Sequence, residues 1–190
     1  HAGGGFHHGF ADHAEGFCYI NDVAIAAAYA VERGLFNRIA VIDTDVHQGN
    51  GTAKIFEGNK DIFTFSIHQE RLYPFKEKGD LDIGLANDIG DDAYCEALGP
   101  AIEQLLDRFY PDLVIYVAGA DPYEKDKLGS LGLTFEGMAR RDRLVLEPVV
   151  ERGIAFVTVV AGGYSIDLQD TIDLHVQTVR IALDACSRLV

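Results

Sequence analysis

Apolar residues gather in short continuous runs, and stretches with helical patterning lie between them. Runs that are rich in β-branched residues and do not alternate with polar positions are typical of strands buried on both faces of a parallel sheet. The runs that predict strands cover residues 39–42, 113–117 and 154–160, and a further short strand is predicted at 62–67.

Helical patterns with recognisable ends separate these runs. The predicted helices cover approximately residues 22–33, 91–109, 138–151 and 170–188. Asn21 is a candidate N-cap for the first, and Gly153 follows the end of the third. Strands that alternate with helices predict a three-layer α/β/α fold around a mostly parallel sheet, with residues 1–190 forming one domain.

Charge and composition exclude several classes of protein. The net charge of −14 argues against direct nucleic-acid binding and against an anionic membrane surface. No apolar run approaches the roughly 18 to 20 residues that a membrane span needs. The 3 cysteines are widely spaced and odd in number, which predicts a reducing, cytoplasmic location. Residues 79–96 contain acidic side chains and no lysine or arginine, so we expect a solvated acidic loop that leads into a helix.

Polar segments follow three of the apolar runs, at the point where each strand is expected to end: residues 43–51, 118–121 and 161–164. Ligands bind at the carboxyl ends of the strands in open parallel sheets, so we expect these segments to meet at one rim. The side chains placed there are Asp45, His47, Asp121 and Tyr164.

The first of these segments indicates a metal site. Asp43, Asp45 and His47 occupy alternate positions, so strand geometry would point them to one face. Two carboxylates beside an imidazole favour a cation among them. Asp45, His47 and Asp121 would supply three ligands and leave a fourth position for water or substrate, as in a catalytic zinc site, although oxygen-rich ligation also suits Fe²⁺ or Mn²⁺. The alternative is a strand-end turn whose carboxylates cap the following helix, with Asp121 in an ordinary turn.

Two further segments carry candidate catalytic groups. Residues 3–9 read Gly-Gly-Gly-Phe-His-His-Gly, and the imidazoles of His7 and His8 suit general acid and base work. Asp43 would orient one of them and Asn50 the other. Tyr164, after two glycines, would donate a hydrogen bond to a developing oxyanion. The alternatives are a histidine-rich terminus without a site and a tyrosine that only packs.

These motifs in this order resemble the zinc-dependent histone deacetylase family, whose fold is shared with arginase. The matching elements are Gly-Phe-His-His, Gly-Phe-Cys-Tyr-Ile-Asn-Asp, Asp-Thr-Asp-Val-His-Gln-Gly-Asn-Gly, Ala-Gly-Ala-Asp and Gly-Gly-Tyr. The glycine-rich opening and the segment 127–133 are similar to the class IV branch and its bacterial relatives.

The resemblance implies a role for each matching position. The zinc ligands would be Asp45, His47 and Asp121; His8 would be the general base and acid beside His7; Tyr164 would polarise the amide carbonyl. Gly16 and Phe17, with Tyr73 opposite, would line the acyl-lysine channel. A structural K⁺ or Na⁺ would lie at Asp43, Asp45, His47, Ser66 and Ile67. Asn50 stands where class I members have aspartate, so its histidine partner should be held less strongly as a cation.

The resemblance also implies a reaction. We expect a metal-dependent deacylase that hydrolyses the amide of acetyl-lysine in a protein, or of an acylated polyamine or small amine. The family's chain normally begins before the tandem histidines, so we expect a catalytic domain truncated at its amino terminus. The alternatives are a non-catalytic acyl-lysine or acylpolyamine binding module and an arginase-like binuclear manganese hydrolase.

Overall fold

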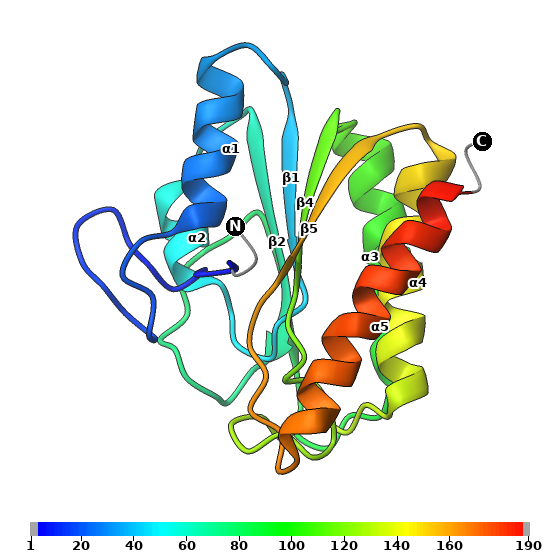
Figure 1. Cartoon of the computed structure of the whole chain (residues 1–190). Coiled ribbons are helices and arrows are strands. Elements are labelled where there is room, and N and C mark those ends of the chain that lie inside the picture. Colours follow the sequence, from blue (N-terminus) through cyan, green and yellow to red (C-terminus); the bar gives the residue numbers. More distant parts are fainter. Residues whose placement is uncertain (1–3, 188–190) are drawn as a thin grey trace.

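Five parallel strands form one sheet in the order β3-β2-β1-β4-β5 (Figure 1). The computed structural model describes residues 4–187, so His1, Gly3 and the predicted helix end at Arg188 lie outside the described residues. The strands are β1 (Ile39–Asp43), β2 (Ile62–Gln69), β3 (Leu81–Leu85), β4 (Leu113–Ala118) and β5 (Ala155–Val160).

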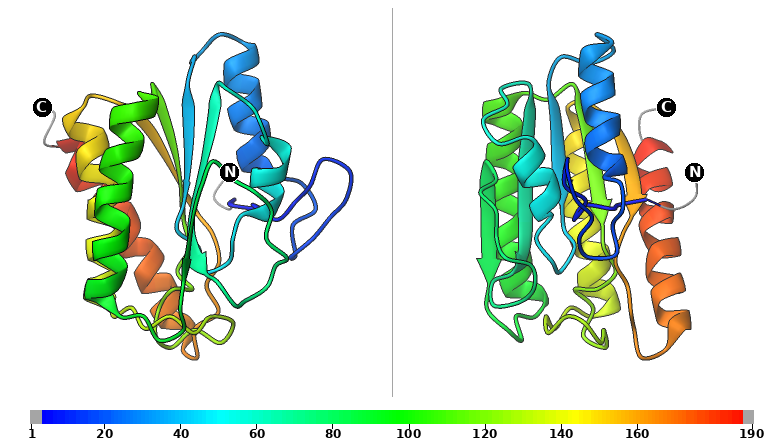
Figure 2. Two further views of the ribbon diagram at one scale, coloured as in Figure 1. Left: turned by 180° about the vertical axis from the view of Figure 1, so that it is seen from behind. Right: turned by 90° about the vertical axis from the view of Figure 1, so that its left-hand side faces the viewer.

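Helices cover both faces of this sheet (Figure 2). On one face lie α1 (Asp22–Glu32) and α2 (Asn50–Ile55), and on the other lie α3 (Asp91–Phe109), α4 (Phe135–Glu151) and α5 (Leu168–Ser187). The predicted three-layer α/β/α arrangement with a parallel sheet is therefore confirmed.

Helix ends follow the local chemistry of the sequence. The side chain of Asn21 accepts a hydrogen bond from the Ala24 N–H, as predicted for the N-cap of α1. Thr134 caps α4 in the same way through the Gly137 N–H, so this helix begins at Phe135, earlier than the predicted residue 138.

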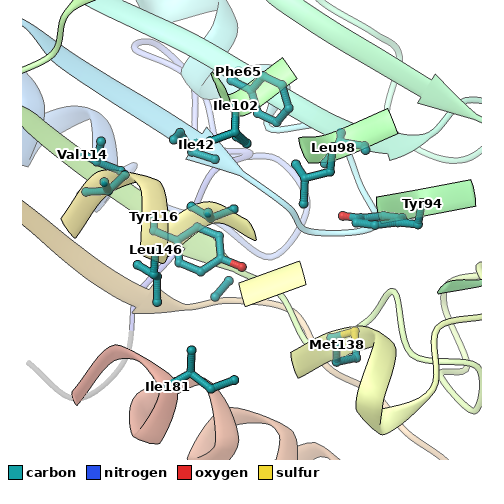
Figure 3. Packing of buried hydrophobic residues seen from close by; sticks show 14 of the residues in the cluster. Ile42, Phe65, Tyr94, Leu98, Ile102, Val114, Tyr116, Met138, Leu146 and Ile181 are labelled. Atoms are coloured by element: carbon teal, nitrogen blue, oxygen red, sulfur yellow. The ribbon is translucent and has the colours of Figure 1, made fainter. Parts of the chain in front are cut away.

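Two apolar layers hold the sheet between the helices. The larger lies under α3, α4 and α5 (Figure 3), and its buried side chains include Ile42, Phe65, Leu98, Ile102, Tyr116, Leu146 and Ile181. The smaller lies under α1. Burial of one such aliphatic side chain contributes roughly 1.5 to 3 kcal/mol, and together the two layers fix the carboxyl ends of β1 and β4 side by side.

Several sequence expectations need correction. The stretch 79–96 is not only a loop, because β3 lies within it as an edge strand whose outward positions are exposed. The run at β5 is not buried on both faces, since β5 forms the other edge and Val157 is exposed. The short helix α2 was not predicted. Among the helices of residues 4–187, none is long and apolar enough to cross a membrane.

Candidate active site

Three buried or nearly buried side chains meet where β1 and β4 end. Nδ1 of His47 lies 3.1 Å from Oδ1 of Asp45 and 3.3 Å from Oδ2 of Asp121. One ligand atom from each residue lies within 4.8 Å of those of the other two. Strand β1 ends at Asp43. The bend that follows the strand therefore places Asp45 and His47, and strand alternation does not.

The chemistry of these donors fits a metal ion. Oδ2 of Asp121 is buried and accepts no hydrogen bond of suitable geometry from the described residues, although it lies within ion-pair distance of His47. A buried carboxylate oxygen without a donor is costly unless a cation compensates it. The backbone of Gly162 lies close to the Asp121 carboxylate, and only glycine fits there because a Cβ would collide with Oδ2 of Asp121. The structure therefore brings together all three predicted ligands in an arrangement that suits a divalent cation.

The charges in this cluster are strongly coupled. Burial, together with the neighbouring Asp45 carboxylate, raises the pKa of Asp121 to about 7. Burial also opposes ionisation of Asp45, but His7 and His47 outweigh it and hold the pKa of Asp45 well below its usual range. A cation among these carboxylates would relieve their mutual repulsion.

The tandem histidines lie beside this cluster, and each has a different partner. Nδ1 of His7 lies 2.6 Å from Oδ2 of Asp43, and Nδ1 of His8 lies 2.8 Å from Oδ1 of Asn50. The two rings are 4.1 Å apart between centroids. The structure thus makes both of the pairings expected from the sequence.

Their surroundings shift the pKa values of the two imidazoles in opposite directions. Burial disfavours the charged form of His7, but the Asp43 and Asp45 carboxylates outweigh it and raise its pKa to about 9. Burial and the adjacent His7 lower the pKa of His8 to about 3. Adjacent titratable groups whose environments push their pKa values apart are typical of acid–base sites.

Tyr164 stands on the loop that follows β5. Its backbone N–H donates to Oδ2 of Asp126 at 2.6 Å, which fixes the turn after Gly162 and Gly163. Partial burial and nearby carboxylates, Asp121 first among them, raise the pKa of the phenol, so it remains a hydrogen-bond donor at neutral pH. The ring is partly exposed and faces Phe17 with 6.4 Å between centroids.

A pocket of about 450 Å³ opens between these groups. Its walls include the predicted channel residues Gly16, Phe17 and Tyr73, and its lining extends to the metal-site side chains, both histidines and Tyr164. Phe17 has a left-handed backbone with φ of 64°, and its exposed side chain forms part of the pocket wall. The predicted metal, histidine, tyrosine and channel residues therefore share one cavity, and Asp43 and Asn50 contact it through His7 and His8.

Two of the predicted monovalent-cation residues, Asp45 and His47, line the pocket, and the other three are Asp43, Ser66 and Ile67. Ser66 and Ile67 belong to β2, where Ser66 is the register partner of Asp43. Oγ of Ser66 lies 2.9 Å from Nδ1 of His68. The backbone brings Ser66 and Asp43 together, while the binding of K⁺ or Na⁺ stays a prediction.

Sequence reasoning missed Glu15 and Asp126. Oε1 of Glu15 accepts hydrogen bonds from Asn50 and from Tyr73, and Asp126 fixes the Tyr164 loop. The only sequence signal for either was an acidic residue within a turn, which is also common on ordinary surfaces.

Comparison with known proteins identifies the family of this chain. Residues 1–179 match the histone deacetylase domain. The chain is 43% identical over 182 residues to an uncharacterized protein of Picosynechococcus sp., covering 95% of this chain and 61% of that protein. It is 33% identical over 172 residues to the histone deacetylase-like amidohydrolase of Pseudomonas aeruginosa, covering 84% of this chain and 45% of that protein.

A solved structure is similar as well. The acetylpolyamine aminohydrolase of Burkholderia pseudomallei matches with a TM-score of 0.78 and 28% identity over 96% of this chain and 54% of that one. The chain belongs to the histone deacetylase family, with bacterial deacetylases among its relatives, and the resemblance drawn from its motifs is confirmed. It spans between 45% and 61% of the length of the three relatives described.

Proposed function

We propose that this chain is a catalytic domain that hydrolyses the amide of an acylated amine with the help of one divalent metal ion. The observation that carries the proposal is that a single pocket collects a carboxylate–imidazole triad, two differently partnered histidines and a phenol. Relatives named as a deacetylase-like amidohydrolase and an acetylpolyamine aminohydrolase support the same reaction class.

Asp45, His47 and Asp121 would hold the metal. Zinc suits three protein ligands with an open fourth position, and Fe²⁺ suits the same nitrogen and oxygen donors. When bound, such an ion supplies a Lewis acid that acidifies water and polarises an acyl oxygen.

The tandem histidines would move the protons. His8 lines the pocket, and burial beside His7 lowers its pKa and favours the uncharged ring, whose free nitrogen would accept a proton from the attacking water. The same imidazole then returns a proton to the leaving amine. The contact with Asp43 would fix the orientation of the His7 ring beside His8.

Tyr164 would stabilise the charge that develops on the acyl oxygen. Its phenol remains protonated and is carried on a loop that Asp126 holds in place, so a donor is positioned before the reaction begins.

The pocket walls indicate the substrate class. Phe17 and Tyr73 offer aromatic surface to an aliphatic tether, and the missing side chain of Gly16 lets the His8 ring lie close to this wall. An acyl-lysine side chain in a protein and an acylated polyamine both present an amide at the end of such a tether. A structural K⁺ or Na⁺ at Asp43, Asp45, His47, Ser66 and Ile67 would stiffen the wall behind the metal.

A hydrolysis panel tests this function. Purified protein is assayed for free amine from acetyl-lysine peptides, longer acyl-lysine peptides and acetylated polyamines, with and without a chelator. We expect release from at least one class, abolished by the chelator. Binding of these compounds without any release would support a binding module and contradict the proposal.

A further inference from the structure

Glu15 lies just outside the pocket, on a tight turn that fixes its backbone. Its N–H donates to the Cys18 carbonyl at 3.2 Å, and the Cys18 N–H donates back at 2.7 Å. Gly16 and Phe17 between them both have left-handed backbones, with φ of 52° and 64°. Two successive residues of this kind are typical of a type I′ turn, so the side chain of Glu15 projects from a well-defined position.

The carboxylate of Glu15 joins two parts of the site. Oε1 accepts a hydrogen bond from Oη of Tyr73 at 2.8 Å and another from Nδ2 of Asn50 at 3.2 Å. Asn50 is buried, and its side chain also contacts His8. Glu15 therefore contacts the residue that in turn contacts the imidazole proposed as the base.

This contact decides which way the Asn50 amide faces. An ionised carboxylate only accepts hydrogen bonds, so the amide NH₂ must point to Glu15 and the amide oxygen to Nδ1 of His8. Nδ1 must then carry the hydrogen, and a neutral imidazole keeps its lone pair on Nε2.

We infer that Glu15 is a positioning residue that acts through Asn50 to hold His8 in the Nδ1–H tautomer, an inference that rests on the proposed role of His8 as base. An aspartate at position 50 would offer an acceptor oxygen in either orientation and would need no such partner. An asparagine is asymmetric, and a flipped amide would place its NH₂ against Nδ1 and favour hydrogen on Nε2. His8 would then present a donor, which cannot accept a proton from water.

The test compares Glu15→Ala with Glu15→Gln. Glutamine still offers an acceptor oxygen to Asn50 and Tyr73, whereas alanine offers none. Asp12→Ala is the matched control, because it removes an exposed charge from the same segment and its carboxylate contacts His13 instead of Asn50. Steady-state kinetics and ¹⁵N NMR of the His8 ring are measured on metal-loaded protein.

For Glu15→Ala we expect kcat to fall by about tenfold, the usual cost of losing such an outer partner, with KM changed less than about threefold. The His8 resonances should shift towards the Nε2–H tautomer. Glu15→Gln and Asp12→Ala should keep the wild-type kcat within about threefold and the Nδ1–H tautomer.

An unchanged tautomer in Glu15→Ala, or a loss in Glu15→Gln as large as in Glu15→Ala, would overturn the inference. If the wild-type protein hydrolyses no compound of the panel, the proposed function fails, and the NMR comparison still decides the role of Glu15.

Discussion

His7 and Asp43 form a buried pair in which the imidazole Nδ1 lies 2.6 Å from the carboxylate. The other oxygen of Asp43 accepts from the Asp45 N–H at 3.0 Å, so one carboxylate supports both a histidine and the start of the metal-site loop. This arrangement requires two acceptor oxygens at position 43.

Replacement of Asp43 by asparagine tests that requirement. Asparagine retains one acceptor oxygen, but its NH₂ group cannot accept from His7. We expect kcat to fall at least about tenfold, as for other outer partners of a catalytic imidazole, while the protein still binds metal. Turnover and elemental analysis on the same sample check this result, and wild-type turnover would contradict the orienting role.

Removal of a proposed metal ligand should act differently. Asp121→Ala and His47→Ala each delete one of three donors, so we expect loss of bound zinc together with activity. Glu124→Ala, an exposed acidic residue nearby, serves as the control and should keep its metal. Full metal content in Asp121→Ala would show that the ion is held elsewhere.

Tyr164→Phe separates oxyanion stabilisation from metal binding. The substitution removes one hydroxyl and leaves the ring opposite Phe17 in place. Turnover should drop by about 10² to 10³, as is typical when an oxyanion donor is lost, with zinc content unchanged. A Phe variant as active as the wild type would rule out this role for the phenol.

Asp112 lies far from the pocket, and we expect its carboxylate to stabilise the fold. Its carboxylate accepts hydrogen bonds from the backbone N–H groups of Asn37 and Arg38 at 2.8 and 2.9 Å. These bonds connect the segment before β1 with the segment before β4. Burial opposes its ionisation, but the hydrogen bonds from Asn37 and Arg38 together outweigh burial and lower the pKa of Asp112. Asp112→Ala should reduce the free energy of unfolding by about 1 kcal/mol at pH 7.

The pH dependence of that effect has a defined sign. Since the pKa is lower in the folded state, the contribution is fully present above the unfolded value of about 4 and fades as pH falls through the folded value. Urea unfolding of the wild type and Asp112→Ala at pH 7 and pH 3 measures it. A difference that grows on acidification would contradict the hydrogen-bond assignment.

The fold was predictable where burial leaves a strong pattern. β1 and β4 are continuously apolar because helices cover both of their faces. β3 escaped prediction because an edge strand can carry acidic residues on its exposed side, and α2 is too short to show a helical period. Asp45, His47 and Asp121 were predictable because parallel strands end at one rim. Glu15 was not, since only the folded turn reveals that it faces Asn50.

Reconstitution of the metal-free protein with zinc tests whether one metal ion per chain is required for hydrolysis. Amine release from the best substrate of the panel is measured as zinc is added in steps to a known concentration of chain. We expect activity to be absent without metal, to rise with added zinc and to reach its plateau at one equivalent per chain. Activity that survives without metal, or that requires two equivalents as in a binuclear hydrolase, would contradict this expectation.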